Sequence, residues 1–380
     1  MDKKTNSLAP KNHYEILDGL RGVAAIMVVA FHVFETLNGG NRFKQIINHG
    51  YLAVDFFFLL SGFVVAYAYD DRWQKMTVSQ FFQRRLIRLQ PMVVMGSIVG
   101  AVFFYFQACS VFPLVNQTSV WKMLMMMVIG FTLIPVPISM DIRGWQEMHP
   151  LNGPAWSLLF EYLANIFYAL FVRKFSKAVL AALVFLSACL LTQYLVMGPQ
   201  GDIIGGWSID PVQLRIGFTR MLFPFFAGVL LSRYGKLIQV KGAFWICSLL
   251  LIVSFSAPRF GGTEHLWMNG LYEAFCIIIL FPILVSIGAG GHFNGKVSAK
   301  TSEFLGELSY PLYITHYPLI YTYVAWVTNN KITLSNGLGV GFLLLVCAIV
   351  IAYLCLKFFD KPVRTWLTKR FLVKEVIKAD

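Results

Sequence analysis

Residues 336–358, NGLGVGFLLLVCAIVIAYLCLKF, form an apolar run in which Lys357 is the one charged side chain. An α-helix rises about 1.5 Å per residue, so a run of this length crosses the roughly 30 Å hydrocarbon core of a bilayer. Ten other mostly apolar runs precede it, and the sequence therefore predicts an all-α, polytopic membrane helical bundle. These runs lie at about 16–37, 51–69, 89–108, 120–138, 155–172, 178–197, 217–232, 242–256, 271–288 and 308–327.

The overall composition leads to the same class. Of the 380 residues, 57% are hydrophobic and 13% are charged, whereas a soluble domain has about 25% charged residues. This excludes a soluble enzyme, a disordered chain and a fibrous repeat. No long hydrophilic block interrupts the apolar runs, so we expect one membrane domain at 16–358, a cytoplasmic tail at 1–15 and an amphipathic cytoplasmic tail at 359–380.

The distribution of basic residues predicts the topology. The chain has 32 Lys and Arg against 19 Asp and Glu, and in a membrane protein such an excess favours cytoplasmic loops over nucleic-acid contacts. If all eleven runs crossed, most basic residues between the spans would lie outside. If 120–138 does not cross, ten crossings put both termini in the cytoplasm and leave few basic residues outside: Arg42, Lys44, Lys122, Arg143, Arg215, Arg259 and Lys331.

Two segments do not cross in this topology. Pro135 and Pro137 suit 120–138 as a re-entrant or interfacial helix. The tail after Pro362 has apolar residues near helical spacing with Lys and Arg between them, so we expect it to lie along the lipids of the inner leaflet. Those apolar residues are Val363, Trp366, Leu367, Phe371, Val373 and Val376.

The six cysteines show no paired metal-ligand spacing, and most of them lie inside apolar runs. We interpret them as small core hydrophobes, because neither a disulfide framework nor a metal site fits this pattern. They are Cys109, Cys189, Cys247, Cys276, Cys347 and Cys355.

The first span contains two ionisable residues that are costly in lipid, Arg21 and His32. They are eleven positions apart, so they share a helix face within about 20° and are separated by roughly 16 Å along the axis. Asp18, one turn before Arg21, is positioned to pair with it. The alternative is a structural histidine bonded to a backbone carbonyl, with an arginine that reaches the membrane surface.

Two carboxylates enter the membrane from the outer side. In the ten-crossing topology Asp55 and Glu161 both follow an outer segment, so we expect both at a depth comparable to that of His32. A carboxylate can orient a histidine that acts as general base and can stabilise the imidazolium that forms. The alternative is hydrogen bonding between packed helices, and the spacing does not decide which acid partners His32.

Three arginines follow the second span, at Arg84, Arg85 and Arg88. Arg84 and Arg88 are four residues apart and share a helix face. Such a cluster either anchors a cytoplasmic loop or binds phosphate, because guanidinium groups match phosphate geometry.

His316 lies in the middle of a predicted span, between Pro311 and Pro318. Proline interrupts helical hydrogen bonding, so we expect a local kink that opens a cavity there. The residue is then either a substrate contact or a structural histidine bonded across helices.

These residues belong to motifs that resemble those of the bacterial membrane acyltransferase-three family. Five short motifs follow in the family's order and cover nearly the whole chain, which makes the resemblance specific. Gln90 stands where the family commonly has an aromatic residue, and Asp360-Lys361-Pro362 stands where a Glu-x-Pro-like ending is usual. The motifs are Leu17–Ala25 running on to Phe31-His32, Ala53–Phe63, Arg84/Arg85/Arg88 before Pro91, Trp156-Ser157-Leu158 with Glu161, and Leu308–Tyr313 with His316-Tyr317-Pro318.

The resemblance implies a stand-alone O-acyltransferase of the bacterial cytoplasmic (inner) membrane. It implies transfer of an acyl group, commonly acetyl, from acyl-coenzyme A to a hydroxyl of a cell-surface glycan or lipid-linked saccharide, with no metal. It also implies that Arg21 and His32 are essential and that the three arginines after the second span engage the coenzyme. Substrate-contacting or supporting residues are expected at Asp18, Trp156, Tyr310, Tyr313 and His316.

The residue chemistry and the resemblance agree on one expected mechanism. The donor binds the arginines at the inner face, and its thioester arm passes Arg21. His32, oriented by Asp55 or Glu161, then deprotonates the acceptor hydroxyl or is itself transiently acylated. This mechanism requires that His32 share a cavity with a carboxylate and that a tunnel join that cavity to the arginines.

Two other classes of function fit a polytopic chain. A proton-coupled transporter would use His32, Glu161 and Arg220 as a relay, but it would not need the cytoplasmic arginines. A non-catalytic scaffold would have no use for so many buried ionisable groups. The sequence does not indicate an oligomeric state.

Overall fold

The computed structural model describes residues 11 and 13–372, and the parts of the predicted tails at 1–10, 12 and 373–380 lie outside this description. Within the described residues the chain is helical without a named strand, so the predicted all-α class is confirmed. The helices are α1 (Glu15–Leu37), α2 (Ala53–Tyr69), α3 (Val78–Phe103), α4 (Val120–Gly130), α5 (Ala155–Leu170), α6 (Lys177–Met197), α7 (Pro211–Tyr234), α8 (Ala243–Ser256), α9 (Trp267–Phe275), α10 (Phe281–Gly290), α11 (Lys296–Thr315), α12 (Tyr317–Asn330), α13 (Leu334–Cys355) and α14 (Lys361–Leu367).

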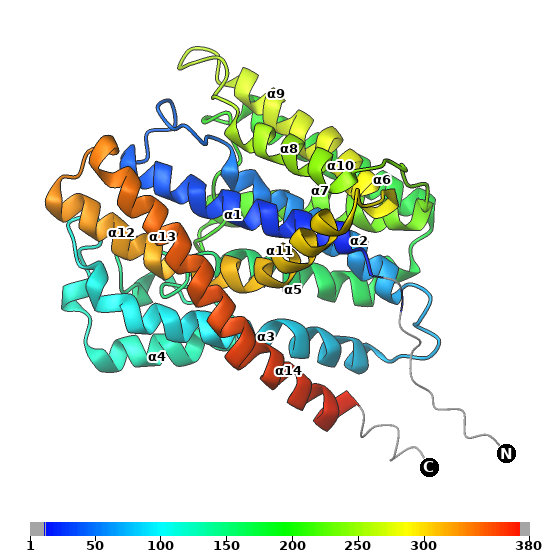
Figure 1. Ribbon diagram of the computed structural model, residues 1–380, viewed down its shortest axis with the longest axis horizontal. Coiled ribbons are helices and arrows are strands. Elements are labelled where there is room, and N and C mark those ends of the chain that lie inside the picture. Colours follow the sequence, from blue (N-terminus) through cyan, green and yellow to red (C-terminus); the bar gives the residue numbers. More distant parts are fainter. Residues whose placement is uncertain (1–10, 12, 373–380) are drawn as a thin grey trace.

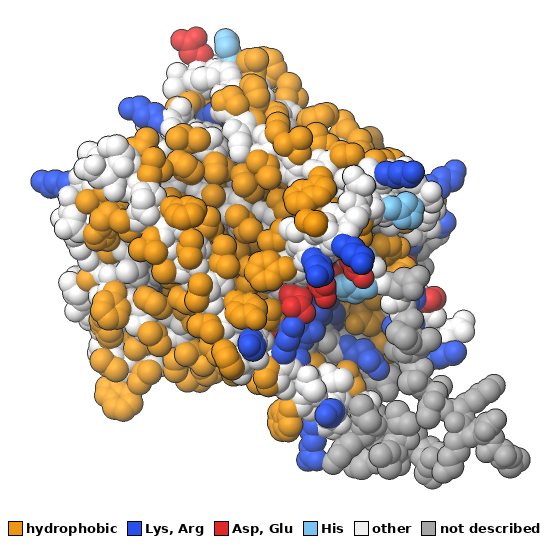
Figure 2. Space-filling model, viewed as in Figure 1, with side chains coloured by type: hydrophobic (Ala, Val, Ile, Leu, Met, Phe, Trp, Pro, Cys, Tyr) orange, Lys and Arg blue, Asp and Glu red, His pale blue; other side chains and the backbone are white. Residues whose placement is uncertain are grey.

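The surface is that of a multi-pass membrane protein. Seven helical stretches among the described residues are long and apolar enough to cross a bilayer, and α4, α5 and α8 are shorter apolar helices. Figure 2 shows hydrophobic side chains over most of one face, with charged side chains gathered toward the end of the bundle where both described chain ends lie. The number of crossings stays a prediction.

Helix α1 lies in the centre of the bundle and packs against α11, α8 and α12 (Figure 1). Gly22 makes the contact with α11 possible, because a Cβ there would lie 2.2 Å from the carbonyl oxygen of Leu305. Small residues allow membrane helices this close approach. The glycines of the first motif therefore fix the helix that contains Arg21 and His32 against its neighbour.

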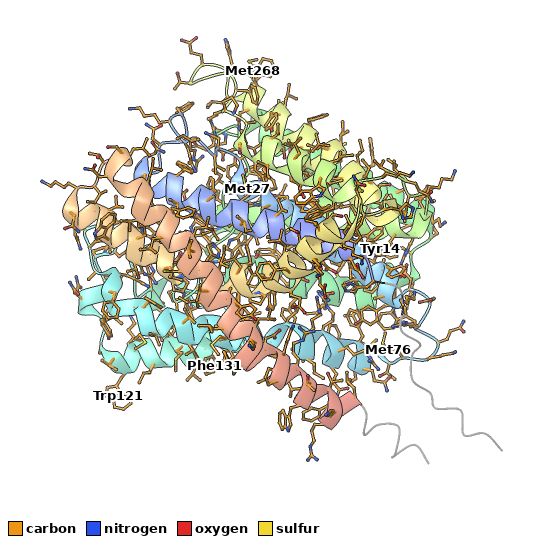
Figure 3. The ribbon with its side chains drawn as sticks, viewed as in Figure 1. Tyr14, Met27, Met76, Trp121, Phe131 and Met268 are labelled. Atoms are coloured by element: carbon orange, nitrogen blue, oxygen red, sulfur yellow. The ribbon has the colours of Figure 1, made fainter. Side chains whose placement is uncertain are left out.

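Helix α4 does not run the length of the bundle. Its 11 residues rise about 16 Å. Figure 3 shows them running from Trp121, toward the left of the view, to Phe131, which lies below Met27 of α1 at a similar horizontal position. The side chain of Gln90 donates a hydrogen bond to the carbonyl oxygen of Phe131 at this inner end. This geometry agrees with a re-entrant helix in the predicted segment 120–138.

Helix α5 begins inside the protein. Ala155 is buried, and Asn152 just before it donates its side-chain N–H to the carbonyl oxygen of Ile314 at 2.9 Å. The irregular segment 131–154 leads into α5, which therefore starts within the packed interior, at the first residue of the predicted span 155–172.

The chain breaks at His316, between α11 and α12, as the prolines predict. The end of the chain is not broken in this way. Helix α13, a π-helical turn at Leu356–Asp360, α14 and a second π-helical turn form one stretch, Leu334–Leu372. Pro362 is tolerated because it lies in the first turn of α14. The described part of the tail thus continues α13, and its predicted place along the inner leaflet stays a prediction.

Candidate active site

A cavity of about 1030 Å³ lies between α1, α2, α3, α5, α11 and α14. Lys11 and Lys369, near the two described ends of the chain, both line it, so these ends meet at one side of the molecule. Charges of both signs face the cavity. The cations are Lys11, Arg21, Arg85, Arg88, Lys361, Arg364 and Lys369, and the acids are Glu15, Asp18, Glu161, Glu303, Glu307 and Asp360.

Several of these cations already have partners. Arg21 Nη1 lies 3.0 Å from Asp18 Oδ1, which confirms the predicted pair, and Arg364 Nη1 lies 3.0 Å from Asp360 Oδ2. Arg88 has no hydrogen bond or ion pair within the described part of the chain. An unpaired guanidinium in such a cavity is available to an anionic group of a ligand.

The three predicted phosphate-binding arginines do not all face the cavity. Helix α3 begins at Val78, well before the predicted span at 89–108, so all three lie within the helix. Arg85 and Arg88 line the cavity, while Arg84 is absent from its described lining. Of the three predicted arginines, Arg85 and Arg88 are therefore the two that the cavity brings together.

Glu161 lies in this cavity and not beside His32. Its Oε1 accepts hydrogen bonds from Arg85 Nη2 at 2.5 Å and from Ser61 Oγ at 2.7 Å. Helix α5 begins inside the protein, less than two turns before Glu161, and so brings this residue to Arg85 and Ser61. Its predicted place in the outer half of the membrane stays a prediction.

A layer of aromatic and hydroxyl side chains closes one end of the cavity. Tyr313 Oη lies 2.8 Å from Ser157 Oγ, and the Tyr313 ring packs edge-on against Phe57 with 5.3 Å between centroids. Behind this layer lies His316, whose ring centroid is 5.9 Å from that of Tyr313. The large cavity therefore ends one ring away from His316.

His32 lies on the other side of that layer. Its Nδ1 is 2.8 Å from Oε2 of Glu35, three residues later on α1. Its ring stacks on that of His316 with 5.7 Å between centroids and meets the ring of Tyr317 edge-on at 4.8 Å. Glu35 was not a predicted site residue, although its spacing from His32 places both on one helix face.

Two expectations about His32 are corrected by these contacts. Neither Asp55 nor Glu161 is bonded to it among the described residues, because each of these acids is paired with an arginine of another helix. His32 is also absent from the described lining of the large cavity, because Tyr313 and His316 lie between. The expected shared cavity is therefore two regions separated by one layer of side chains.

Asp55 is held in a buried ion pair. Its Oδ2 lies 2.7 Å from Nη2 of Arg220, and the guanidinium of Arg220 lies over the ring of Trp156 at 5.2 Å. The predicted supporting residue Trp156 thus covers this pair. Tyr310 lines the large cavity and donates a hydrogen bond to the carbonyl oxygen of Leu89 at 2.7 Å.

A second polar cluster, which was not predicted, lies in the segment before α5. The buried Arg143 lies over the ring of Tyr321 at 3.5 Å, and its Nε is 3.4 Å from Glu147 Oε2. Burial raises the pKa of Glu147 to about 7. The sequence signal was the spacing, because Arg143 and Glu147 are a base and an acid four residues apart.

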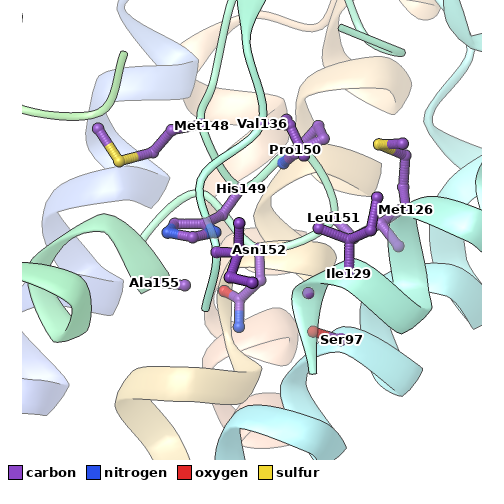
Figure 4. Close-up of a pocket in the computed structure, with 12 residues that line it drawn as sticks. Ser97, Met126, Ile129, Val136, Met148, His149, Pro150, Leu151, Asn152 and Ala155 are labelled. Carbon is purple, nitrogen blue, oxygen red and sulfur yellow. The ribbon is translucent and has the colours of Figure 1, made fainter. Parts of the chain in front are cut away.

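His149 and Asn152 line a small pocket of about 10 Å³ beside this cluster (Figure 4). Nε2 of His149 has no hydrogen-bond partner there, and burial lowers the pKa of His149 to about 3. A pocket of this size has room for at most about one water molecule. Among the described residues, no group of three or more His, Cys, Asp or Glu side chains is placed to hold a metal ion.

Comparison with known proteins gives the chemistry that this arrangement resembles. The family model described as an acyltransferase domain matches residues 14–357. The chain is 24% identical over 382 residues to the peptidoglycan O-acetyltransferase OatA of Listeria monocytogenes, covering 92% of this chain and 55% of the relative. It is 26% identical over 332 residues to the acyltransferase MdmB of Streptomyces mycarofaciens, covering 80% and 78%.

A shorter match, 32% identical over 170 residues, is to protein 2 in the picA locus of Rhizobium radiobacter, covering 43% of this chain and 84% of the relative. The chain spans a little over half the length of the OatA proteins that it matches. No solved structure matches it. The transporter alternative gains no support, because Glu161 and Arg220 of its relay are held in two separate ion pairs.

Proposed function

The chain belongs to the acyltransferase family whose model matches residues 14–357, and from this premise we propose that it transfers an acetyl group from acetyl-coenzyme A to a glycan hydroxyl. The acceptor is a cell-surface glycan or lipid-linked saccharide outside the cytoplasmic membrane of a bacterium. The observation on which the proposal rests is the cavity of about 1030 Å³ that contains Arg21, Arg85 and the unpaired Arg88. The name of the Listeria relative, a peptidoglycan O-acetyltransferase, supports a glycan acceptor.

The cavity suits a donor with phosphates at one end and a short acyl thioester at the other. Arg88 lies within electrostatic reach of Arg364, Arg21 and Arg85, so several guanidinium groups converge on one part of the wall. Guanidinium groups bind phosphate with paired hydrogen bonds. Phe57 contributes an apolar contact in the lining. A coenzyme A thioester matches this arrangement, because its phosphorylated nucleotide is at one end and its acyl group is at the other.

We place this cavity on the cytoplasmic side. Acyl-coenzyme A is a cytoplasmic metabolite, and both described chain ends line the cavity. The excess of basic residues in the segments assigned to the inside supports the same orientation. His32, roughly 16 Å farther along α1, then faces the outer half, where the acceptor arrives.

His32 acts as the general base in this proposal. Its imidazole takes the proton of the acceptor hydroxyl, the oxygen forms the ester bond with the acyl carbon, and the carbon–sulfur bond breaks to release coenzyme A. For the acyl arm to reach His32, the side chains of Phe57, Tyr313 and His316, which separate the cavity from His32, must move aside.

Coenzyme A binding to the purified protein tests the donor site. Arg88→Gln removes an unpaired cation and should weaken the affinity about tenfold, since a charged hydrogen bond in a solvated site is worth about 1.4 kcal/mol. Arg84→Gln is the matched control, because it changes a neighbouring arginine that does not line the cavity, and it should change the affinity less than about twofold. Absence of binding to the wild-type chain, or equal effects of the two variants, would contradict the proposal.

A further inference from the structure

We propose that Glu35 is the positioning residue for His32: its carboxylate accepts the Nδ1–H of the imidazole and leaves Nε2 as the nitrogen that takes the acceptor's proton. The inference rests on the proposed acyl transfer and supplies the carboxylate that the expected mechanism sought elsewhere. It concerns a residue that none of the five family-like motifs contains.

The geometry comes from one helix. Glu35 follows His32 by three residues on α1, and Oε2 of the acid lies 2.8 Å from Nδ1 of the ring, within the normal hydrogen-bond range. The side chain of His32 is 16% exposed and that of Glu35 is 36% exposed. A carboxylate at Nδ1 fixes the tautomer and orientation of the ring, while a shielded imidazole can still exchange a proton through Nε2.

The two acids that the sequence suggested are occupied elsewhere. Asp55 Oδ2 lies 2.7 Å from Arg220 Nη2, and Glu161 Oε1 lies 2.5 Å from Arg85 Nη2. Neither could orient His32 without breaking an ion pair. Within the described residues, Glu35 is therefore the acid that holds the ring.

The other titratable groups that face His32 come from the junction of α11 and α12. His316 stacks on its ring, and Nδ1 of His316 lies 2.8 Å from the carbonyl oxygen of Tyr313, so that nitrogen bears the proton. Tyr317 meets the ring of His32 edge-on, and Glu35 and Glu147 both act electrostatically on Tyr317. Glu35 is thus the negatively charged group that is hydrogen-bonded to His32.

This arrangement completes the proton balance of the proposed transfer. The hydroxyl proton moves to Nε2 of His32, and the imidazolium that results is stabilised by the carboxylate of Glu35. The acceptor oxygen forms a bond to the acyl carbon, and the carbon–sulfur bond of the thioester breaks. The departing thiolate of coenzyme A takes the proton from Nε2 of His32. Glu35 is not protonated at any step.

Transfer kinetics of Glu35→Gln test the proposal. We expect kcat to fall about tenfold, with KM for the donor unchanged, because general-base catalysis typically contributes about 10²–10⁴-fold and depends on the orientation of the base. The rise of kcat with pH should move to lower pH, since loss of the carboxylate destabilises the imidazolium. Glu35→Asp should recover part of the rate. Glu264→Gln, an exposed acid in the loop before α9, is the control and should behave as wild type.

A chemical readout separates this inference from the proposed function. Diethylpyrocarbonate modifies neutral imidazole, and mass spectrometry of the full-length protein gives the modification rate of His32 at each pH. We expect half-maximal reactivity at a lower pH in Glu35→Gln than in wild type. If the wild-type chain shows no acyl transfer, the proposed function fails while these curves still decide the pairing. Coincident curves, or an unchanged kcat and pH profile in Glu35→Gln, would overturn it.

Discussion

The large cavity and the surroundings of His32 both adjoin helix α1, but they are built in opposite ways. The cavity has a volume of about 1030 Å³ and a wall of acids and bases, several of them in partly exposed ion pairs. Around His32 the ring of His316 stacks on the imidazole and the ring of Tyr317 meets it edge-on, and His32 does not line the cavity.

The difference separates two physical tasks. Binding a large anion requires room and cations whose present partners water or ligand can replace, because exposed ion pairs contribute little stability. Moving a proton requires an imidazole held in one tautomer and shielded from bulk water. Helix α1 joins the two tasks through Arg21 at its cavity end and His32 near its other end.

The strongest test of this division is His32→Ala. The variant should lose transfer by about 10³-fold, as expected when a general base is removed, and should bind coenzyme A as well as the wild type does. Transfer assays and equilibrium binding on the same preparation give both numbers, with gel filtration as the folding control. Near-normal transfer, or a large loss of coenzyme A affinity, would show that the two regions are not separate in function.

Asp55→Asn tests whether Asp55, which the sequence suggested as a partner of His32, acts in catalysis or stabilises the fold. The substitution leaves the buried guanidinium of Arg220 without its carboxylate, and breaking a buried ion pair in this way costs about 3–5 kcal/mol. We expect a large drop in unfolding temperature and little folded protein. Asp71→Asn, which breaks an exposed pair with Lys11, should leave the unfolding temperature nearly unchanged. Equal stability of both variants would return Asp55 to the list of catalytic candidates.

Local rules were enough to predict some of this from the sequence. The apolar runs gave the helical class, the three-residue spacing gave the pair of Asp18 with Arg21, and the prolines gave the break at His316. The same spacing connects His32 with Glu35. The sequence prediction does not include this pair, because it assigns the carboxylate partner of His32 to Asp55 or Glu161 on other spans.

Other features depend on contacts between distant segments. Helical spacing shows which residues share a face, but whether Arg84 or Arg85 meets the cavity depends on α5 and α14 beside α3. The position of Glu161 within the bundle depends on the irregular segment before α5, which sets where that helix begins. The helical periodicity of the sequence does not show which arginine meets the cavity or where Glu161 lies.

The pH dependence of stability tests how closely the side chains around His149 are packed. Burial lowers the pKa of His149 to about 3, whereas an unperturbed histidine, as in the unfolded chain, has a pKa near 6.5. Stability from this group is therefore complete above pH 6.5 and falls as the pH drops toward 3, by at most about 1.4 kcal/mol per pH unit. Thermal unfolding between pH 7 and 5 should show a shallower decline in His149→Gln than in wild type. Parallel curves would mean that water reaches this histidine.

The smallest expected effect concerns the contribution of α14 to the cavity. Arg364 lines the cavity, is 35% exposed and already pairs with Asp360, so Arg364→Gln should weaken coenzyme A binding about threefold, as for a partly screened charge. Lys357→Gln, on the same continuous helix but outside the cavity lining, is the matched control. Equal affinities of the two variants would remove α14 from the donor site.

A structure of the full chain with a non-hydrolysable acetyl-coenzyme A analogue tests the central claim most directly. We expect the nucleotide phosphates beside Arg88 and the acyl end at the layer of Tyr313, next to His316, on whose far side the ring of His32 stacks. A nucleotide bound outside this cavity, or an acyl end pointing away from Tyr313, would contradict the account.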